Sequence, residues 1–73
     1  NQTFSIFPNP SKKTIYLNWN SQKEESFSIL DFSGRVIQSG EVVFGENTLS
    51  IEGLKTGMYF IEVGGVRKKF VKY

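Results

Sequence analysis

Residues 54–63 read LKTGMYFIEV, and the fold prediction starts from this stretch. Its first four residues have the composition of a turn, in which Gly57 is expected to take a positive φ. The six residues that follow are rich in aromatic and branched side chains, which favour a β-strand. Alternation sorts that strand into two faces, one with Tyr59, Ile61 and Val63 and the other with Met58, Phe60 and Glu62. Because most of these side chains are apolar, we expect a central strand with both faces at least partly covered.

Further extended segments precede and follow this strand. The clearest is Thr14–Asn20, in which Ile15, Leu17 and Trp19 alternate with more polar residues. The others are Phe4–Phe7 with Phe4 and Ile6 on one face, Glu25–Asp31 with Phe27 and Ile29 inward, Arg35–Val43 with Val36 inward, a segment that carries Leu49 and Ile51, and Val66–Tyr73, whose faces the pattern leaves open. No window of eleven or more residues shows the 3.6-residue apolar period of an amphipathic helix.

Proline and glycine separate these segments. Pro8-Asn9-Pro10 fixes two φ angles and removes two N–H donors, which predicts a rigid corner. In Asp31–Gly34 the aspartate can accept hydrogen bonds from backbone N–H groups, and the glycine is expected at positive φ. A turn is predicted at Gly45–Asn47 and a hairpin at Gly64–Gly65, and Gly40 is expected to mark a bulge or a bend.

The length and the turn spacing together indicate the fold class. The chain has 73 residues, enough for one small domain. Turn signals recur about every 8–12 residues, the spacing of an all-β sandwich or a small barrel. We therefore predict an all-β fold for residues 1–73, a small immunoglobulin-like β-sandwich of about seven antiparallel strands in two sheets. A six-stranded version results if Phe4–Phe7 does not pair.

Composition limits the chemistry that this domain can perform. The absence of Cys and His removes disulfides, thiol catalysis, Ser-His triads and the commonest metal ligands. No calcium-loop or phosphate-loop pattern is present. The net charge of +2 is too small to indicate nucleic-acid binding, and no secretory leader or membrane-length apolar run occurs. The sequence therefore predicts a domain without catalysis, metal or cofactor, and without a nucleic-acid partner.

Two features allow a functional interpretation beside a structural one. As a corner, Pro8-Asn9-Pro10 needs no role beyond fixing the backbone. The basic terminal run Arg67–Tyr73 suits an edge strand whose lysines prevent sheet-to-sheet aggregation. It also suits a terminal signal that a receptor recognises by strand addition. Composition alone favours the structural interpretation of both.

These pieces occur together, in this order, in a known family. The chain resembles the type A C-terminal sorting domain of the bacterial type IX (Por) secretion system. The matching pieces are FSIFPNPS at residues 4–11, ILDFSGRVI at 29–37, NTLSIEGLKTGMYFIEV at 47–63 and KKFVK at 68–72. The resemblance covers essentially the whole chain, and the order of the pieces is more specific than any one of them. The terminal Tyr73 is a mild departure.

The resemblance implies a role in protein export. Such a domain follows an N-terminal passenger, and a type IX outer-membrane shuttle recognises it after the protein has reached the periplasm of a Gram-negative bacterium. A sortase-like peptidase then removes the domain, and the passenger is attached to the cell surface or released. The family's recognition elements correspond to Pro8, Asn9, Pro10, Gly57, Tyr59, Lys68, Lys69 and Lys72. Cleavage is expected at or before Asn1, with residues 1–73 being a fragment of a longer secreted protein.

A binding module is the competing hypothesis. An immunoglobulin- or fibronectin-like domain that binds carbohydrate or protein would use Tyr16, Trp19 and Phe32 as an exposed aromatic platform. Alternation argues against this, because it places Trp19 on the apolar face of its strand. Under either hypothesis an exposed strand edge would allow a homodimer in which two copies continue one sheet.

Overall fold

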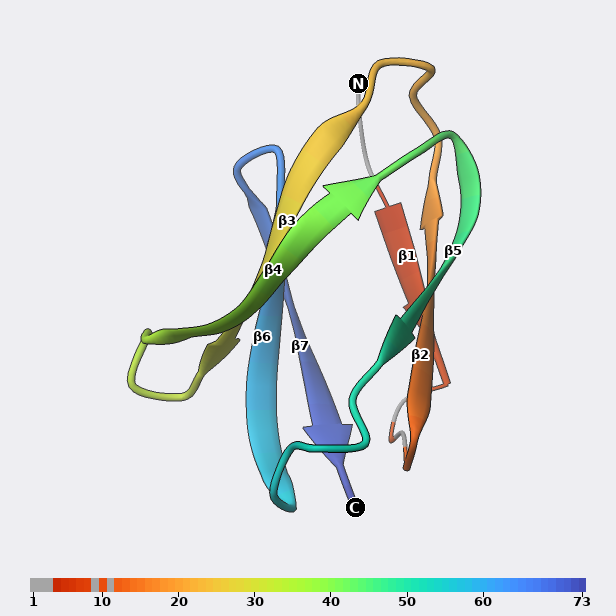
Figure 1. Cartoon of the computed structure of the whole chain (residues 1–73). Helices are drawn as coiled ribbons and strands as arrows, with labels where there is room; N and C mark the ends of the chain where they lie inside the picture. Colours follow the sequence, from red (N-terminus) through yellow and green to blue (C-terminus); the bar gives the residue numbers. More distant parts are fainter. Residues whose placement is uncertain (1–3, 9, 11) are drawn as a thin grey trace.

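The computed structural model describes residues 4–8, 10 and 12–73, and this part of the chain consists of strands joined by short connections (Figure 1). The strands are β1 (Phe4–Phe7), β2 (Thr14–Trp19), β3 (Glu25–Asp31), β4 (Val36–Val42), β5 (Gly45–Ser50), β6 (Gly57–Val63) and β7 (Val66–Lys72). The all-β prediction is confirmed. The seven-stranded version is correct, since β1 pairs with β2. Among the described residues there is no helix able to cross a membrane.

The strands form two antiparallel sheets that pack face to face. One has the order β1-β2-β5 and the other the order β4-β3-β6-β7, on opposite sides of the molecule in Figure 1. The chain changes sheet after β2, after β4 and after β5, which is the Greek-key pattern of an immunoglobulin-like sandwich. β6 lies between β3 and β7, so the stretch LKTGMYFIEV does supply a central strand. Its outer face is only partly covered, because Met58 is exposed.

The core lies between the sheets and is built from alternate residues of each strand. Its members are Phe4, Ile15, Leu17, Trp19, Phe27, Ile29, Val42, Leu49, Ile51, Tyr59, Ile61, Val63 and Phe70. The inward faces predicted for β2 and β3 are therefore confirmed. In β1 and β6, where the prediction did not say which face points inward, the core is reached by Phe4 and by Tyr59, Ile61 and Val63. Trp19 is almost completely buried, and its indole Nε1 donates a hydrogen bond to the carbonyl of Lys23 at 2.9 Å. That bond satisfies the polar atom of the largest core side chain.

The faces of β4 differ from the prediction. Val36 was expected inward but is exposed, and Val42 is the buried residue of this strand. Between Ile29 and Leu30 the register of β3 against β4 shifts by one residue, which leaves Ile37 as the extra residue of a bulge. One extra residue exchanges the two faces of a strand, so the alternation read from the sequence does not hold across it.

Two glycines have roles other than the predicted ones. Gly40 is not a bulge: it pairs regularly with Phe27, and a Cβ on it would lie 2.7 Å from Cε2 of the Phe27 ring. Gly57 is not at positive φ: it is the first residue of β6 and pairs with Lys72. Gly40 is therefore required by the packing of a neighbouring ring, whereas Gly57 is not required by the backbone conformation.

The connection between β4 and β5 also lies elsewhere than expected. Gly45, with φ of 96°, already begins β5, so the chain turns at Val43 and Phe44. The side chain of Asn47 closes this turn from within the strand. Its Nδ2 donates to the carbonyls of Val43 at 2.9 Å and Gly45 at 3.1 Å, and its Oδ1 accepts from the N–H of Val43 at 2.9 Å. The turn predicted at Gly45–Asn47 is thus wrong in position.

The turns at Gly34 and at Gly64–Gly65 are confirmed, with φ of 94°, 56° and 83°. In the first of them Asp31 Oδ1 accepts from the backbone N–H groups of Ser33 and Arg35, both at 3.0 Å. It also accepts from the Ser33 hydroxyl at 2.6 Å. These hydrogen bonds, with that from the hydroxyl foremost, hold the pKa of the Asp31 carboxyl below its usual value.

Candidate functional site

Several of the predicted recognition residues meet at one end of the sandwich. β1 and β7 both finish there, and β2 and β6 both begin there (Figure 1). We call this the C-terminal end. Pro8 and Pro10 follow β1 and are exposed at this end, while Gly57 and Lys72 pair across β6 and β7. Asn9 lies outside the described residues. The start of β1 lies at the opposite end of the sandwich.

Tyr59 lies inside the sandwich rather than on its surface. It is 8 % exposed, and its Oη donates a hydrogen bond to the carbonyl of Lys55, four residues earlier, at 2.6 Å. Its ring stacks on that of Phe70, with centroids 5.7 Å apart. A tyrosine near the start of the sixth strand that bonds back to the preceding loop is the tyrosine corner of immunoglobulin-like sandwiches. The structure thus gives this tyrosine a fold-stabilising role.

The fold uses the side chain of Tyr59, but it does not require a glycine at position 57. Its φ is not positive, and a Cβ on it would make only an ordinary contact, 3.9 Å from Cε2 of Tyr59. Gly53, in the connection before β6, has no atom within 4 Å of such a Cβ. Both positions therefore accept alanine as far as the domain itself is concerned. The sequence pattern could not separate a glycine that the fold needs from one that it does not.

The lysines of β7 lie on different faces of the strand. Lys68 and Lys72 share the inner face with Phe70. The Nζ of Lys68 lies 5.6 Å from the centroid of the Phe4 ring, so this side chain reaches across the open side between β1 and β7. Lys72 is 9 % exposed, and its Nζ donates to the carbonyl of Tyr73 at 3.3 Å. Lys69 faces outward and is exposed.

Two residues of the terminal run Arg67–Tyr73 that are not among the family's recognition elements accompany Lys69 on the outer face. Val71 faces outward beside it and pairs with Met58 of β6. Arg67 also faces outward, with its guanidinium carbon 5.5 Å from the centroid of the Phe60 ring and its Nη2 3.7 Å from Oε2 of Glu62. Alternation of β7 around Phe70 could have found these residues, had the inner face of the strand been known.

The aromatic platform of the competing hypothesis is not formed. Trp19 lies in the core, and Tyr16 lies on the opposite face of β2, where its ring contacts that of Phe7 with centroids 5.6 Å apart. Phe32 is exposed, but it lies in the turn that joins β3 to β4, in the other sheet. The three rings therefore cannot act together on one ligand.

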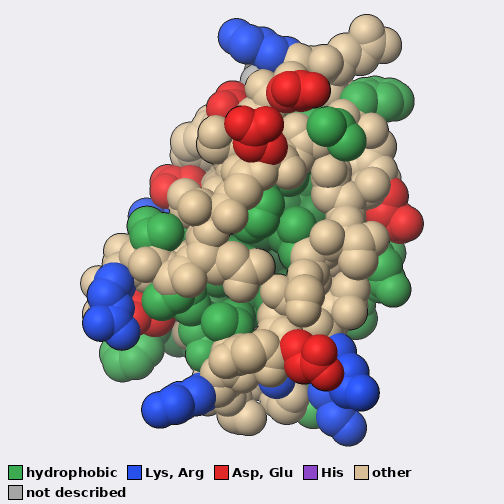
Figure 2. Space-filling view, viewed as in Figure 1, with side chains coloured by type: hydrophobic (Ala, Val, Ile, Leu, Met, Phe, Trp, Pro, Cys, Tyr) green, Lys and Arg blue, Asp and Glu red, His purple; other side chains and the backbone are tan. Residues whose placement is uncertain are grey.

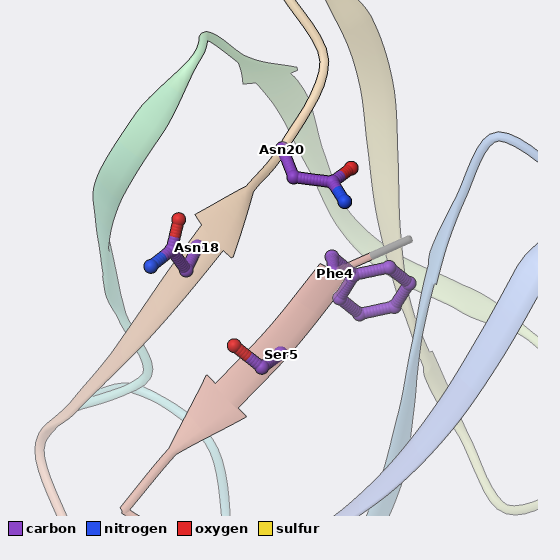
Figure 3. A pocket seen from close by; sticks show the side chains of 4 residues that line it. All are labelled: Phe4, Ser5, Asn18 and Asn20. Carbon is purple, nitrogen blue, oxygen red and sulfur yellow. The ribbon is translucent and has the colours of Figure 1, made fainter. Parts of the chain in front are cut away.

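A shallow depression on the β1–β2 pair carries polar groups but offers no ring for stacking (Figure 3). Ser5, Asn18 and Asn20 line it together with Phe4. The Phe4 ring points from the strand towards the other sheet and belongs to the core. In the part of the chain that the structure describes, no group of three or more acidic, Cys or His side chains is placed to hold a metal ion.

Comparison with known proteins identifies the family to which the chain belongs. A family model described as a secretion system C-terminal sorting domain matches residues 5–73. Among curated proteins, the beta-agarase A of Zobellia galactanivorans is 33 % identical over 67 residues, which are 90 % of this chain but 12 % of that protein. No solved structure matches the chain significantly. The chain therefore belongs to the family of secretion system C-terminal sorting domains, those of the type IX system that its sequence resembles.

Proposed function

We propose that residues 1–73 form the last domain of a longer passenger protein and direct its transport by the type IX system from the periplasm through the outer membrane. The family match supports the export role. The position of the chain within its own protein is part of the proposal. So are the next steps, namely recognition by an outer-membrane shuttle, removal of the domain by a sortase-like peptidase at or before Asn1, and attachment of the passenger to the cell surface or its release.

The observation that carries this proposal is that the first strand begins at one end of the sandwich, whereas most of the described recognition residues lie at the other end. β1 starts at one end, and Pro8, Pro10, Gly57 and Lys72 lie at the other. A folded passenger joined ahead of β1 would therefore sit away from the C-terminal end and leave it open to a receptor. A sorting domain needs this arrangement, because it must be recognised in the same way whatever passenger precedes it.

The recognition residues divide into those that build the domain and those that a partner would contact. Tyr59, Lys68 and Lys72 are engaged in contacts of the fold. We assign direct recognition to Pro8, Pro10 and Lys69, which are exposed, and to Gly57, a position where the fold does not require a glycine. A glycine at the start of β6 would permit close approach of a partner's backbone. The domain itself would perform no chemistry.

The test is export of a reporter fusion in a host that has the type IX system. Removing residues 67–73 would not be a clean test, since it deletes β7 and the fully buried Phe70 and is therefore expected to unfold the domain. Alanine at Gly57 is cleaner, and alanine at Gly53 is its matched control. We expect the unaltered and G53A fusions to reach the outside, and the G57A fusion to remain in the periplasm with an unchanged melting temperature.

Each result of this experiment decides a separate point. If the unaltered fusion stays in the periplasm, the proposed function is wrong. If it is exported and the G57A fusion is exported equally well, the domain is a sorting signal but Gly57 has no part in recognition.

Homodimer formation remains a prediction, and the charges of β7 limit how it could occur. β7 is an edge strand of its sheet. It carries four basic residues and no acidic one, namely Arg67, Lys68, Lys69 and Lys72. Antiparallel pairing of two β7 strands would place cations near one another, which destabilises a sheet. We therefore expect any dimer to form through another edge strand. Sedimentation of the chain with and without salt would measure whether a dimer forms and whether charge repulsion opposes it.

A further inference from the structure

The outer face of the four-stranded sheet, on the side away from the core, is divided into two halves. The half near the β6–β7 hairpin carries Ser26, Ser28, Ser39, Glu41 and Glu62. The half near the C-terminal end carries Leu30, Val36, Met58, Phe60 and Val71. We call these five residues the outer patch. A solvent-facing sheet surface ordinarily alternates apolar-in and polar-out, so an apolar half-face on the outside calls for an explanation.

The strand register makes the outer patch continuous across all four strands. Leu30 of β3 pairs with Val36 of β4 on one side and with Phe60 of β6 on the other. In the next row Met58 pairs with Val71 of β7. Leu30 is only 5 % exposed although it faces away from the core, whereas Val36, Met58 and Val71 are 54 %, 42 % and 40 % exposed. The patch therefore has a covered centre and an open periphery, as interaction surfaces do.

The charges around the outer patch have a positive excess. Arg67 lies over the Phe60 ring, and Lys69 is directly opposite Phe60 in the register. The side chain of Arg35 is 80 % exposed, and its Nε lies 3.4 Å from Oδ2 of Asp31. Two carboxylates, those of Asp31 and Glu62, lie beside these three cations. Figure 2 shows hydrophobic side chains at the surface near the β3–β4 turn, at its lower left, next to charged groups of both signs.

We propose that the outer patch is a docking surface for a partner protein whose contact surface has an apolar centre and carboxylates at its edge. The positive excess around the patch selects for carboxylates. A second copy of this chain would bring the same cations and is a poorer fit. The patch is continuous with the C-terminal end through Met58 and Val71. This inference rests on the proposed function, and it adds a second recognition surface to the residues expected from the family.

The proposal also specifies which side chains of the terminal strand a partner would contact. Val71, in the patch, and Lys69, beside it, face outward, whereas Lys68, Phe70 and Lys72 face the core side. Substitutions at the outward pair should therefore change recognition with little effect on folding. Substitutions at the inward residues should change folding first.

The test compares substitutions in the outer patch with matched ones elsewhere, in the reporter fusion described above. The patch variant is M58Q with V71T, and its control is V43T with F44Q, a somewhat more exposed apolar pair at the β4–β5 turn. We expect export of the patch variant to fall by about tenfold or more, because it places polar groups at two positions that docking would remove from water. The control should stay within about twofold of the unaltered fusion, since most surface substitutions have small effects.

The charge requirement is tested separately and does not depend on apolar substitutions. Lys69→Glu should reduce export by about tenfold, whereas Lys69→Arg, which keeps the charge, should export normally. Lys23→Glu, at an exposed lysine between β2 and β3, is the control for a charge change as such. Melting temperatures close to that of the unaltered chain should accompany every variant.

The outcomes separate this inference from the proposed function. If the unaltered fusion is exported and the patch and Lys69 variants are exported equally well, the docking surface and the assignment of Lys69 to direct recognition are wrong, and the sorting role stands. If the unaltered fusion is not exported, both are wrong. Flotation with vesicles containing anionic lipid, or a patch-dependent dimer in sedimentation, would identify a lipid surface or a second copy as the occupant and would also overturn the proposal.

Discussion

Replacing Tyr59 by Phe removes a single hydroxyl group and so separates the fold-stabilising role of this tyrosine from a recognition role. The hydroxyl donates to the Lys55 carbonyl at 2.6 Å, and the ring, stacked on Phe70, would stay in place. The loss is therefore close to the net worth of one hydrogen bond, about 1 kcal/mol. For a domain of this size that lowers the melting temperature by roughly 4–8 °C.

The assay pairs thermal unfolding, followed by circular dichroism, with export of the reporter fusion at a temperature where the variant is folded. We expect Y59F to melt lower than the unaltered chain and to be exported normally. Tyr59→Ala, which also removes a buried ring, should cost about 3–5 kcal/mol and abolish both properties. The interpretation as a tyrosine corner would be refuted by an unchanged melting temperature together with lost export, because the hydroxyl would then be a contact of the partner.

Further predictions concern the core and one turn. Gly40→Ala should lower the free energy of unfolding by about 1–3 kcal/mol in urea titrations, because its Cβ would overlap the Phe27 ring, and Phe27→Leu should restore part of the loss. Trp19→Phe should cost about 1–3 kcal/mol in the same titrations, since it removes buried volume and the hydrogen bond to Lys23, and an unaffected midpoint would contradict the core placement. Asp31→Asn should destabilise the domain at neutral pH and have less effect in acid. A lowered carboxyl pKa gives stability that is present above the ordinary value of 3.8 and is lost as the pH falls through the folded-state pKa. Melting temperatures of both chains from neutral to acidic pH would reveal this convergence.

Alternation predicted most of the core because β2, β3 and β6 are regular strands with one face buried. It failed in β4, where the bulge at Ile37 exchanges the faces, and nothing in the local composition of that strand marks the extra residue. The turn after β4 was misplaced for a related reason. Asn47 closes it through side-chain bonds to Val43 and Gly45, which a pattern of turn-forming residues does not reveal.

The candidate site was predictable as a set of residues but not as a set of roles. The motif pieces contain Gly57 and Tyr59 two residues apart, yet only the structure shows that Tyr59 forms a buried corner and that the fold does not require a glycine at position 57. Lys68 and Lys69 are adjacent, and their opposite directions follow from the burial of Phe70. Alternation placed Met58 and Phe60 on one face of β6, but the extent of the outer patch could not be predicted, since it depends on the register of four strands.

The central claim is that this small sandwich is sufficient to direct export. The most direct measurement is the fraction of a reporter found outside the outer membrane when residues 1–73 are fused to its C-terminus. It is compared with the reporter alone, in a host with the type IX system and in the same host without it. We predict export only for the fusion, and only when the system is present. Equal distribution of the fusion in the two hosts would contradict the account.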